Sequence, residues 1–137
     1  MSDRGGSTPP IVHGVRLFDA GAFWDAHEAW EHLWKADRGS DRHYLKGLIQ
    51  YAAACHHLER GNLRPARTLL ASGCAHLEAN RSERWPFHTA RIIEDMRDLA
   101  LRITPAPERS GDAQAPPRPR PLRRHLRRSP PDAGAVR

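Results

Sequence analysis

Three of the four tryptophans of this 137-residue chain lie in one stretch, Phe23–Trp34, which limits what the rest of the chain can fold into. On a helix, side chains three and four positions apart share one face. This spacing collects one apolar arc, formed by Phe23, Ala26, Trp30, Leu33 and Trp34. His27 adjoins the arc, Glu31 and Trp24 come next, and Glu28 stands at the margin. Burying polar groups costs several kcal/mol unless each has a partner, so the other helices must cover this face and supply those partners.

Glycine, proline and capping residues divide the chain into four expected helices. The first is expected to begin at Asp19 as its cap, with Phe18 and Phe23 packed together there, and to end near Gly39. The others span about 41–60, 63–79 and 87–104, with a short extra helix near 82–85. No segment alternates as a strand would, and short loops favour antiparallel neighbours. We therefore predict an all-α fold of four to five helices in antiparallel pairs, a helical bundle or array built around the second helix.

The positive charge of the chain is concentrated near its C-terminal end. The formal net charge is +6, and the residues from Thr104 onward contribute eight arginines against three acids. This segment also holds eight of the twelve prolines and too few apolar side chains to fold alone. We therefore predict a flexible N-terminus over 1–14, a helical domain over 15–103 and a disordered basic tail over 104–137. The tail favours at most weak binding to nucleic acid, because it has no aromatic residue to stack on bases.

Other signals in the sequence argue against several classes of protein. Cys55 and Cys74 lie among small or apolar neighbours and are expected to be reduced core thiols. The N-terminus lacks the apolar core of a signal peptide, and no apolar run approaches the roughly 20 residues that span a bilayer. We therefore expect a cytoplasmic protein with no membrane partner and no cofactor. Four histidines are expected at the surface or at helix edges, without a role: His32, His56, His76 and His88.

A set of motifs recurs in one known family. It comprises the segment 18–31, then Trp34 and Arg42, the segment 47–52, His57, and Arg60-Gly61-Asn62 with Ala66 after it. In this order and spacing the chain resembles the bacterial and archaeal domain of unknown function 309, over roughly residues 16–80. The resemblance implies a small all-helical domain and no assigned activity. Asp19 stands where the family commonly has Asn and Asp25 where it has Glu, and the Arg/Pro tail lies outside the similarity.

The polar residues of the first two predicted helices support three interpretations. The set is His27, Glu28, Glu31, Arg42, Gln50 and His57, with Trp24, Trp30 and Trp34 as walls. In the first interpretation they form a buried hydrogen-bond network, in which Glu31 accepts from Arg42 or His57. In the second, His27 and Glu31 lie one helical turn apart as a base and its orienting group in a small-molecule pocket. In the third, His27, Glu31 and His57 bind a metal ion, although the H-E-x-x-H spacing is absent.

These interpretations lead to two hypotheses about function. The favoured one is a non-catalytic interaction module whose inward polar cluster is structural, with no metal bound. The alternative is a small-molecule-binding or metal-dependent hydrolytic protein with its site at His27, Glu31 and His57, so the sequence leaves enzymatic activity open. The partner is an unidentified small molecule or protein. A homodimer is a further candidate, because four helices with this many tryptophans can leave an apolar patch exposed.

Overall fold

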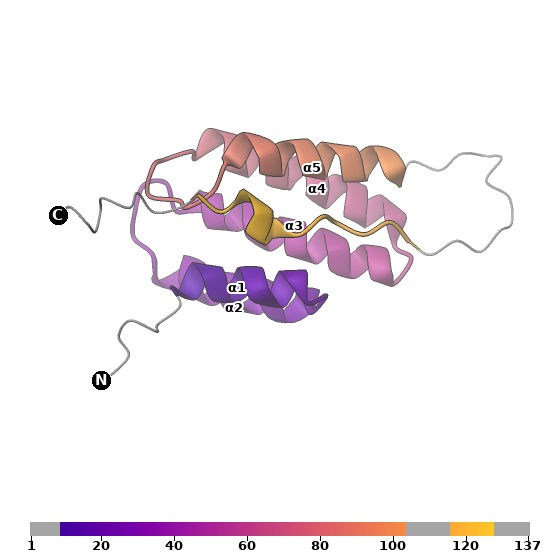
Figure 1. Ribbon diagram of the computed structural model, residues 1–137, viewed down its shortest axis with the longest axis horizontal. Coiled ribbons are helices and arrows are strands. Elements are labelled where there is room, and N and C mark those ends of the chain that lie inside the picture. Colours follow the sequence, from indigo (N-terminus) through magenta and orange to yellow (C-terminus); the bar gives the residue numbers. More distant parts are fainter. Residues whose placement is uncertain (1–8, 104–115, 128–137) are drawn as a thin grey trace, which may run out of the picture.

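The computed structural model describes residues 9–103 and 116–127, which contain five α-helices (Figure 1). They are α1 Pro10–Asp19, α2 Phe23–Ala36, α3 His43–Glu59, α4 Leu63–Ala79 and α5 Thr89–Arg102, followed by the short 3-10 helix η2 Leu122–His125. The described residues form no strand, and successive helices pack in pairs, so the predicted all-α fold is confirmed. None of the described helices is long and apolar enough to span a bilayer.

The central element is α3, which lies between the α1–α2 pair and the α4–α5 pair (Figure 1). It buries side chains on most of its circumference, among them Tyr44, Leu48 and Tyr51. A helix that is apolar almost all round needs neighbours on several sides. Glycines let α4 approach closely, because a Cβ on Gly47 would lie only 2.9 Å from the carbonyl oxygen of Gly73. The core therefore forms around α3, the helix that the sequence analysis placed at the centre.

The helix α1 was not predicted from the sequence. We assigned residues 1–14 to a flexible N-terminus and made Asp19 the cap of the first helix, whereas Pro10 opens α1 and Asp19 ends it. Proline suits the first turn of a helix, where its missing N–H would have no intrahelical partner. Gly21, at a φ of 84°, then turns the chain into α2. The extra helix is thus at the N-terminal end and not near 82–85; residues 1–8 lie outside the described residues.

Aromatic side chains hold α1 against α2. The rings of Phe18 and Phe23 meet edge to face with centroids 5.1 Å apart, so the expected contact forms, although it joins two helices and does not flank a cap. Trp30 is fully buried, and its indole N–H donates to the carbonyl oxygen of Ile11 at 3.0 Å. Gly14 lies against this indole, where any Cβ would clash. Trp30 therefore fixes the position of α1 on α2.

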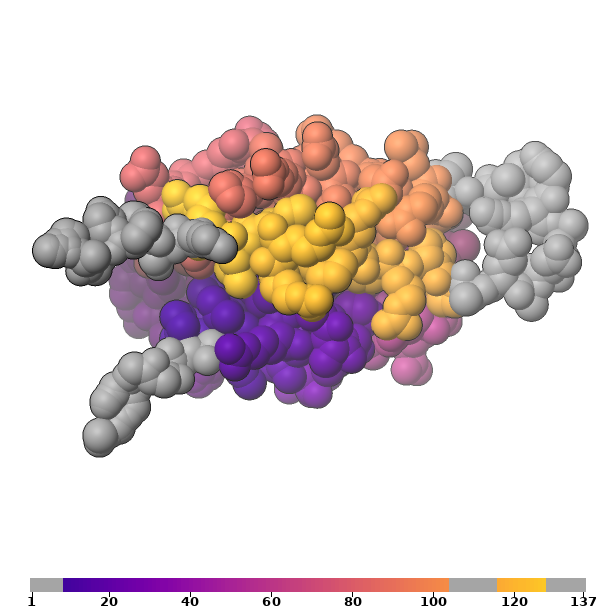
Figure 2. Space-filling view, in the orientation of Figure 1, coloured from indigo at the N-terminus to yellow at the C-terminus, as the bar shows by residue number. Residues whose placement is uncertain are grey.

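Residues 116–127, which we call the strap, lie across the helices between α1 and α5 (Figures 1 and 2). Leu122 is only 1% exposed and His125 only 8% exposed. Leu126 pairs with Phe87 in a single antiparallel bridge. The disorder that we predicted from residue 104 onward therefore does not hold for the strap, while residues 104–115 and 128–137 lie outside the described residues.

Acidic residues of α1 and α5 hold the strap in place. The Asp19 carboxylate accepts the backbone N–H groups of Leu122 at 2.7 Å and of Arg123 at 3.1 Å. These N–H groups belong to the first turn of η2, so Asp19 does serve a helix start, but one 103 residues further along the chain. The Asp95 carboxylate lies 2.7 Å from Nε2 of His125. The strap is therefore fixed by specific hydrogen bonds in addition to its buried leucine.

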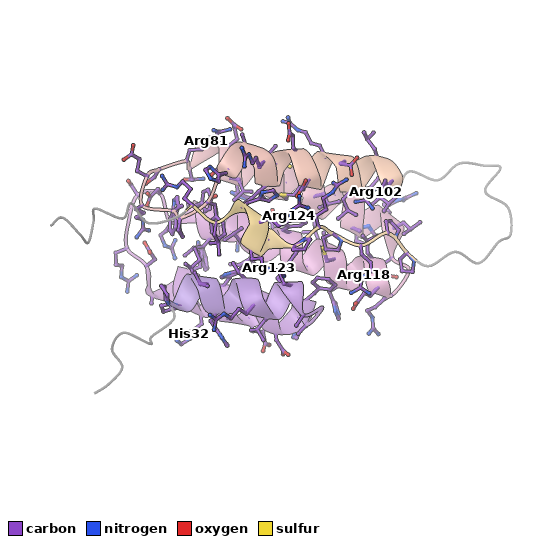
Figure 3. The ribbon with its side chains drawn as sticks, in the orientation of Figure 1. His32, Arg81, Arg102, Arg118, Arg123 and Arg124 are labelled. Atoms are coloured by element: carbon purple, nitrogen blue, oxygen red, sulfur yellow. The ribbon has the colours of Figure 1, made fainter. Side chains whose placement is uncertain are left out.

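Arginines of the strap add contacts at the surface (Figure 3). Arg120 lies 3.0 Å from the Asp98 carboxylate, and this hydrogen bond holds the pKa of Asp98 below its usual value. Arg102 of α5 donates to the carbonyl oxygen of Arg118 at 3.4 Å. Exposed ion pairs of this kind contribute little individually. The basic character of the segment is thus partly matched by the acidic side of α5.

Candidate functional site

Three of the six predicted polar residues lie along one side of α2 and α3, in a surface that we call the α2–α3 strip. The strip consists of Trp24, His27, Glu31 and Trp34 from α2 and of Lys46, Gln50 and His56 from α3. The α2 members recur every three or four residues and so share one helix face. All of them except Trp24 are half-buried, and Trp24 is exposed. The strip is therefore a partly open surface and not a closed interior cluster.

Three rings meet at one end of the strip. Trp24 and His27 are stacked, with ring centroids 4.3 Å apart and planes inclined by 10°. The ring of His56 lies 5.1 Å from that of Trp24, yet Trp24 remains 45% exposed. The sequence analysis gave His56 no role. The available signal was the antiparallel pairing of α2 with α3, which brings the end of α3 beside the start of α2.

Trp34 contacts two cations at the other end of the strip. The guanidinium carbon of Arg42 and Nζ of Lys46 each lie 4.2 Å from the centroid of a Trp34 ring, a distance typical of cation–π interactions. Arg42 also donates to the carbonyl oxygens of Trp34 at 2.9 Å and of Asp37 at 2.8 Å. The Trp34 carbonyl also accepts the backbone N–H of Asp37 at 3.3 Å, so Arg42 adds a second donor there and closes the C-terminal end of α2.

The two carboxylates that were expected to join a hydrogen-bond network have no hydrogen-bond partner among the described residues. Glu28 is exposed and Glu31 is half-buried, and within the described residues neither makes a hydrogen bond or an ion pair. His57 lies at the end of α3, where the Asn62 amide donates to its Nδ1 at 3.3 Å. The structure therefore brings His27 and Glu31 onto one face but links neither of them to Arg42 or His57 by a hydrogen bond among the described residues.

Buried polar atoms without partners are concentrated in the strip. Within the part of the chain that the structure describes, Nδ1 of His27, Nε1 of Trp34 and Oε1 of Gln50 are buried and form no hydrogen bond; Tyr51 and His125 each contribute one further such atom. Leaving a buried donor or acceptor unsatisfied costs roughly 1–3 kcal/mol. Three of these five atoms lie in the strip, and each is covered from solvent.

The structure also locates the third predicted wall residue, the candidate metal ligands and the two cysteines. Trp30, which we expected as a wall beside Trp24 and Trp34, is a core residue between α1 and α2. The described residues contain no group of three or more His, Cys, Asp or Glu side chains that could hold a metal ion. Cys55 and Cys74 are free and buried in the core, and burial raises the pKa of both thiols.

The titration of His27 is the most direct measure of its environment. Burial lowers the pKa of His27 below its usual value of 6.5 and outweighs Glu31 and Glu28, which raise it. We expect an NMR titration of the imidazole to give a pKa below 6.5, and Trp24→Ala to move it upward because the stacked indole no longer covers the ring. Leu63→Ala on α4 is the control and leaves the pKa unchanged.

The same shift links His27 to stability. Because the unfolded chain takes up the proton first as the pH falls, the free energy of unfolding contributed by His27 decreases below pH 6.5. A wild-type pKa at or above 6.5 would contradict the described burial of this ring.

The fold and the strip define a small all-helical domain of antiparallel helix pairs with one aromatic, polar and partly open face. The family model described as Domain of unknown function (DUF309) matches residues 11–69, which confirms the resemblance inferred from the motifs. The matched residues run from α1 into the first half of α4. The match contains every residue of the α2–α3 strip, whereas α5 and the strap lie outside it. No curated protein matches the chain.

Proposed function

We propose that the domain is a non-catalytic interaction module that binds a partner protein through the α2–α3 strip. The observation that carries this proposal is the exposed indole of Trp24, held flat on His27 at 4.3 Å. Tryptophans dominate the binding energy of many interfaces, and an aromatic ring that is already ordered loses little entropy on binding. Trp24 therefore has the properties of an interface anchor.

The surroundings of Trp24 support a protein partner. Lys46 and Glu31 give the strip charges of both signs, and His27 and Gln50 carry buried polar atoms that form no hydrogen bond within the described residues. Protein–protein interfaces are enriched in aromatic residues and carry polar groups around them. The partner that fits is a protein surface with its own donors and acceptors facing the strip.

Catalysis has less support from the same geometry. A general base is usually held by a hydrogen bond to a second group, and no such bond joins His27 to Glu31 within the described residues. His57, the third residue of the hydrolytic hypothesis, contacts Asn62 and belongs to the end of α3. The non-catalytic hypothesis therefore requires fewer rearrangements of the site.

The proposal is tested with a partner recovered by chemical cross-linking and then purified. Calorimetry is expected to show that Trp24→Ala weakens its binding by at least about tenfold, the cost typical of truncating an interface tryptophan. Leu63→Ala, an apolar truncation at the 37% exposed Leu63 of α4, is the matched control and leaves the affinity unchanged. Equal affinities for wild type and Trp24→Ala would exclude the strip as the surface that binds the partner. A hydrolytic activity that His27→Ala abolishes would replace this function by the alternative.

A further inference from the structure

We propose that two copies of this chain associate through the groove between α4 and α5, with α4 antiparallel to α4 of the second copy. The groove has a volume of about 700 Å³ and contains no residue of the α2–α3 strip. The inference therefore stands independently of the proposed function. It assigns an interface to a part of the chain that lies mostly outside the family match.

Seven of the ten residues that line the groove are apolar, and the other three are Arg67, Glu78 and Arg97. Met96 and Cys74 line it, with their sulfur atoms 4.0 Å apart, and the exposed Ala71 and Ala75 leave room above them. Leu101 also lines the groove and is 74% exposed, more than any other large hydrophobic side chain among the described residues. Covering such a surface is favourable, and small residues at a helix crossing permit a close approach.

The order of side chains along α4 suits antiparallel pairing with α4 of a second copy. Around a two-fold axis, residue i of one copy faces residue j of the other, and j faces i. With the axis passing between Ser72 and Gly73, three reciprocal pairs form from the groove residues of α4: Arg67 with Glu78, Leu70 with Ala75, and Ala71 with Cys74. Every groove residue that α4 supplies is thereby matched by another groove residue.

The charges at the two ends of α4 favour this occupant over others. Arg67 lies near one end of the groove and Glu78 near the other, and Arg67 forms no ion pair within the described residues. Glu78 bonds to Arg81 at 3.1 Å through Oε1, and its Oε2 has no partner within the described residues. Arg97 of α5 also lines the groove, so an acidic ligand would be repelled by Glu78 and a basic one by the two arginines. An antiparallel copy of α4 matches both.

Sedimentation velocity of the full chain over a wide concentration range tests the proposal. The wild type is expected to form a dimer. Arg67→Glu and Glu78→Arg should each weaken it about tenfold, because the axis places every substitution in the interface twice and opposes like charges. The double variant Arg67→Glu/Glu78→Arg should restore the wild-type dissociation constant. Asp25→Arg, a charge reversal at an exposed position of α2, is the control and has no effect.

A second variant keeps the test independent of the ion pairs. Leu101→Lys places a charge on the apolar rim and should convert the chain to a monomer with an unchanged circular dichroism spectrum. A wild type that stays monomeric at every concentration overturns the proposal. So does a dimer that neither single charge reversal weakens, because its interface must lie elsewhere. Trp24→Ala, which tests the proposed function, is expected to leave the dimer intact. The two proposals can therefore fail independently.

Discussion

Trp30→Ala is expected to lower the free energy of unfolding by about 3–5 kcal/mol, the range for removing a large aromatic side chain from a core. Trp30 has no exposed surface, packs against Phe18 with ring centroids 6.1 Å apart, and donates its indole N–H to Ile11. Gly14 has no side chain that could move into the space left by the indole. The loss is measured by urea denaturation followed by far-UV circular dichroism.

The matched control is Trp24, which lies in the first turn of the same helix. Trp24→Ala should change the free energy of unfolding by less than about 1 kcal/mol, because Trp24 is 45% exposed and packs mainly on His27. The two variants remove the same side chain six positions apart. Similar losses for both would mean that the described difference in burial is wrong.

The helices that carry strong periodicity could be predicted from the sequence. In α2 and α3 the apolar residues recur at helical spacing, and the glycine of the Gly61-Asn62 pair takes a φ of 80° at the turn into α4. The pattern also placed α3 at the centre, since it is apolar on most sides. These signals are local, so each helix can be predicted without knowing which other helices pack against it.

The two missed elements depend on partners that are distant in sequence. The residues of α1 stand among prolines and glycines, and Val15 and Phe18 become core residues only because α2 folds back on them. The strap has the composition of a disordered segment. Nevertheless, it carries one buried leucine and forms hydrogen bonds to the carboxylates of Asp19 and Asp95. A single sequence contains no signal that joins residues 103 positions apart.

The candidate site was predicted in its α2 part and less well in its α3 part. The helical wheel placed His27, Glu31 and Trp24 together, because their positions depend only on the helix that carries them. The wheel also put Trp30 in the apolar arc that other helices must cover, and Trp30 is buried. The pocket interpretation made Trp30 a wall beside Trp24 and Trp34, whereas α1, the helix that was missed, covers that indole. The choice between His56 and His57 depends on how α3 is rotated against α2, which periodicity alone does not fix.

Leu122→Ala is expected to release the strap and to lower the free energy of unfolding by about 2–3 kcal/mol. Leu122 is 1% exposed and is the most deeply buried side chain of the strap. Removing a buried leucine costs at least about 2 kcal/mol, but this loss cannot exceed the free energy that docks the strap, because a weakened strap detaches before the helices unfold. The effect is measured by urea denaturation of the full chain.

Hydrogen exchange separates strap release from a general loss of stability. The N–H groups of Leu122 and Arg123 are held by Asp19, and that of Arg127 donates to the carbonyl oxygen of Pro86 at 2.8 Å. In Leu122→Ala these amides should exchange about 30-fold to 150-fold faster, and in both proteins they should be less protected than amides in the centre of α3, which exchange only when the helices unfold. Arg124→Ala, at an exposed position of η2 (Figure 3), is the matched control and leaves the exchange rates unchanged. If the strap amides and the α3 amides were equally protected in the wild type, the strap would be part of the cooperative core and not a separately docked segment.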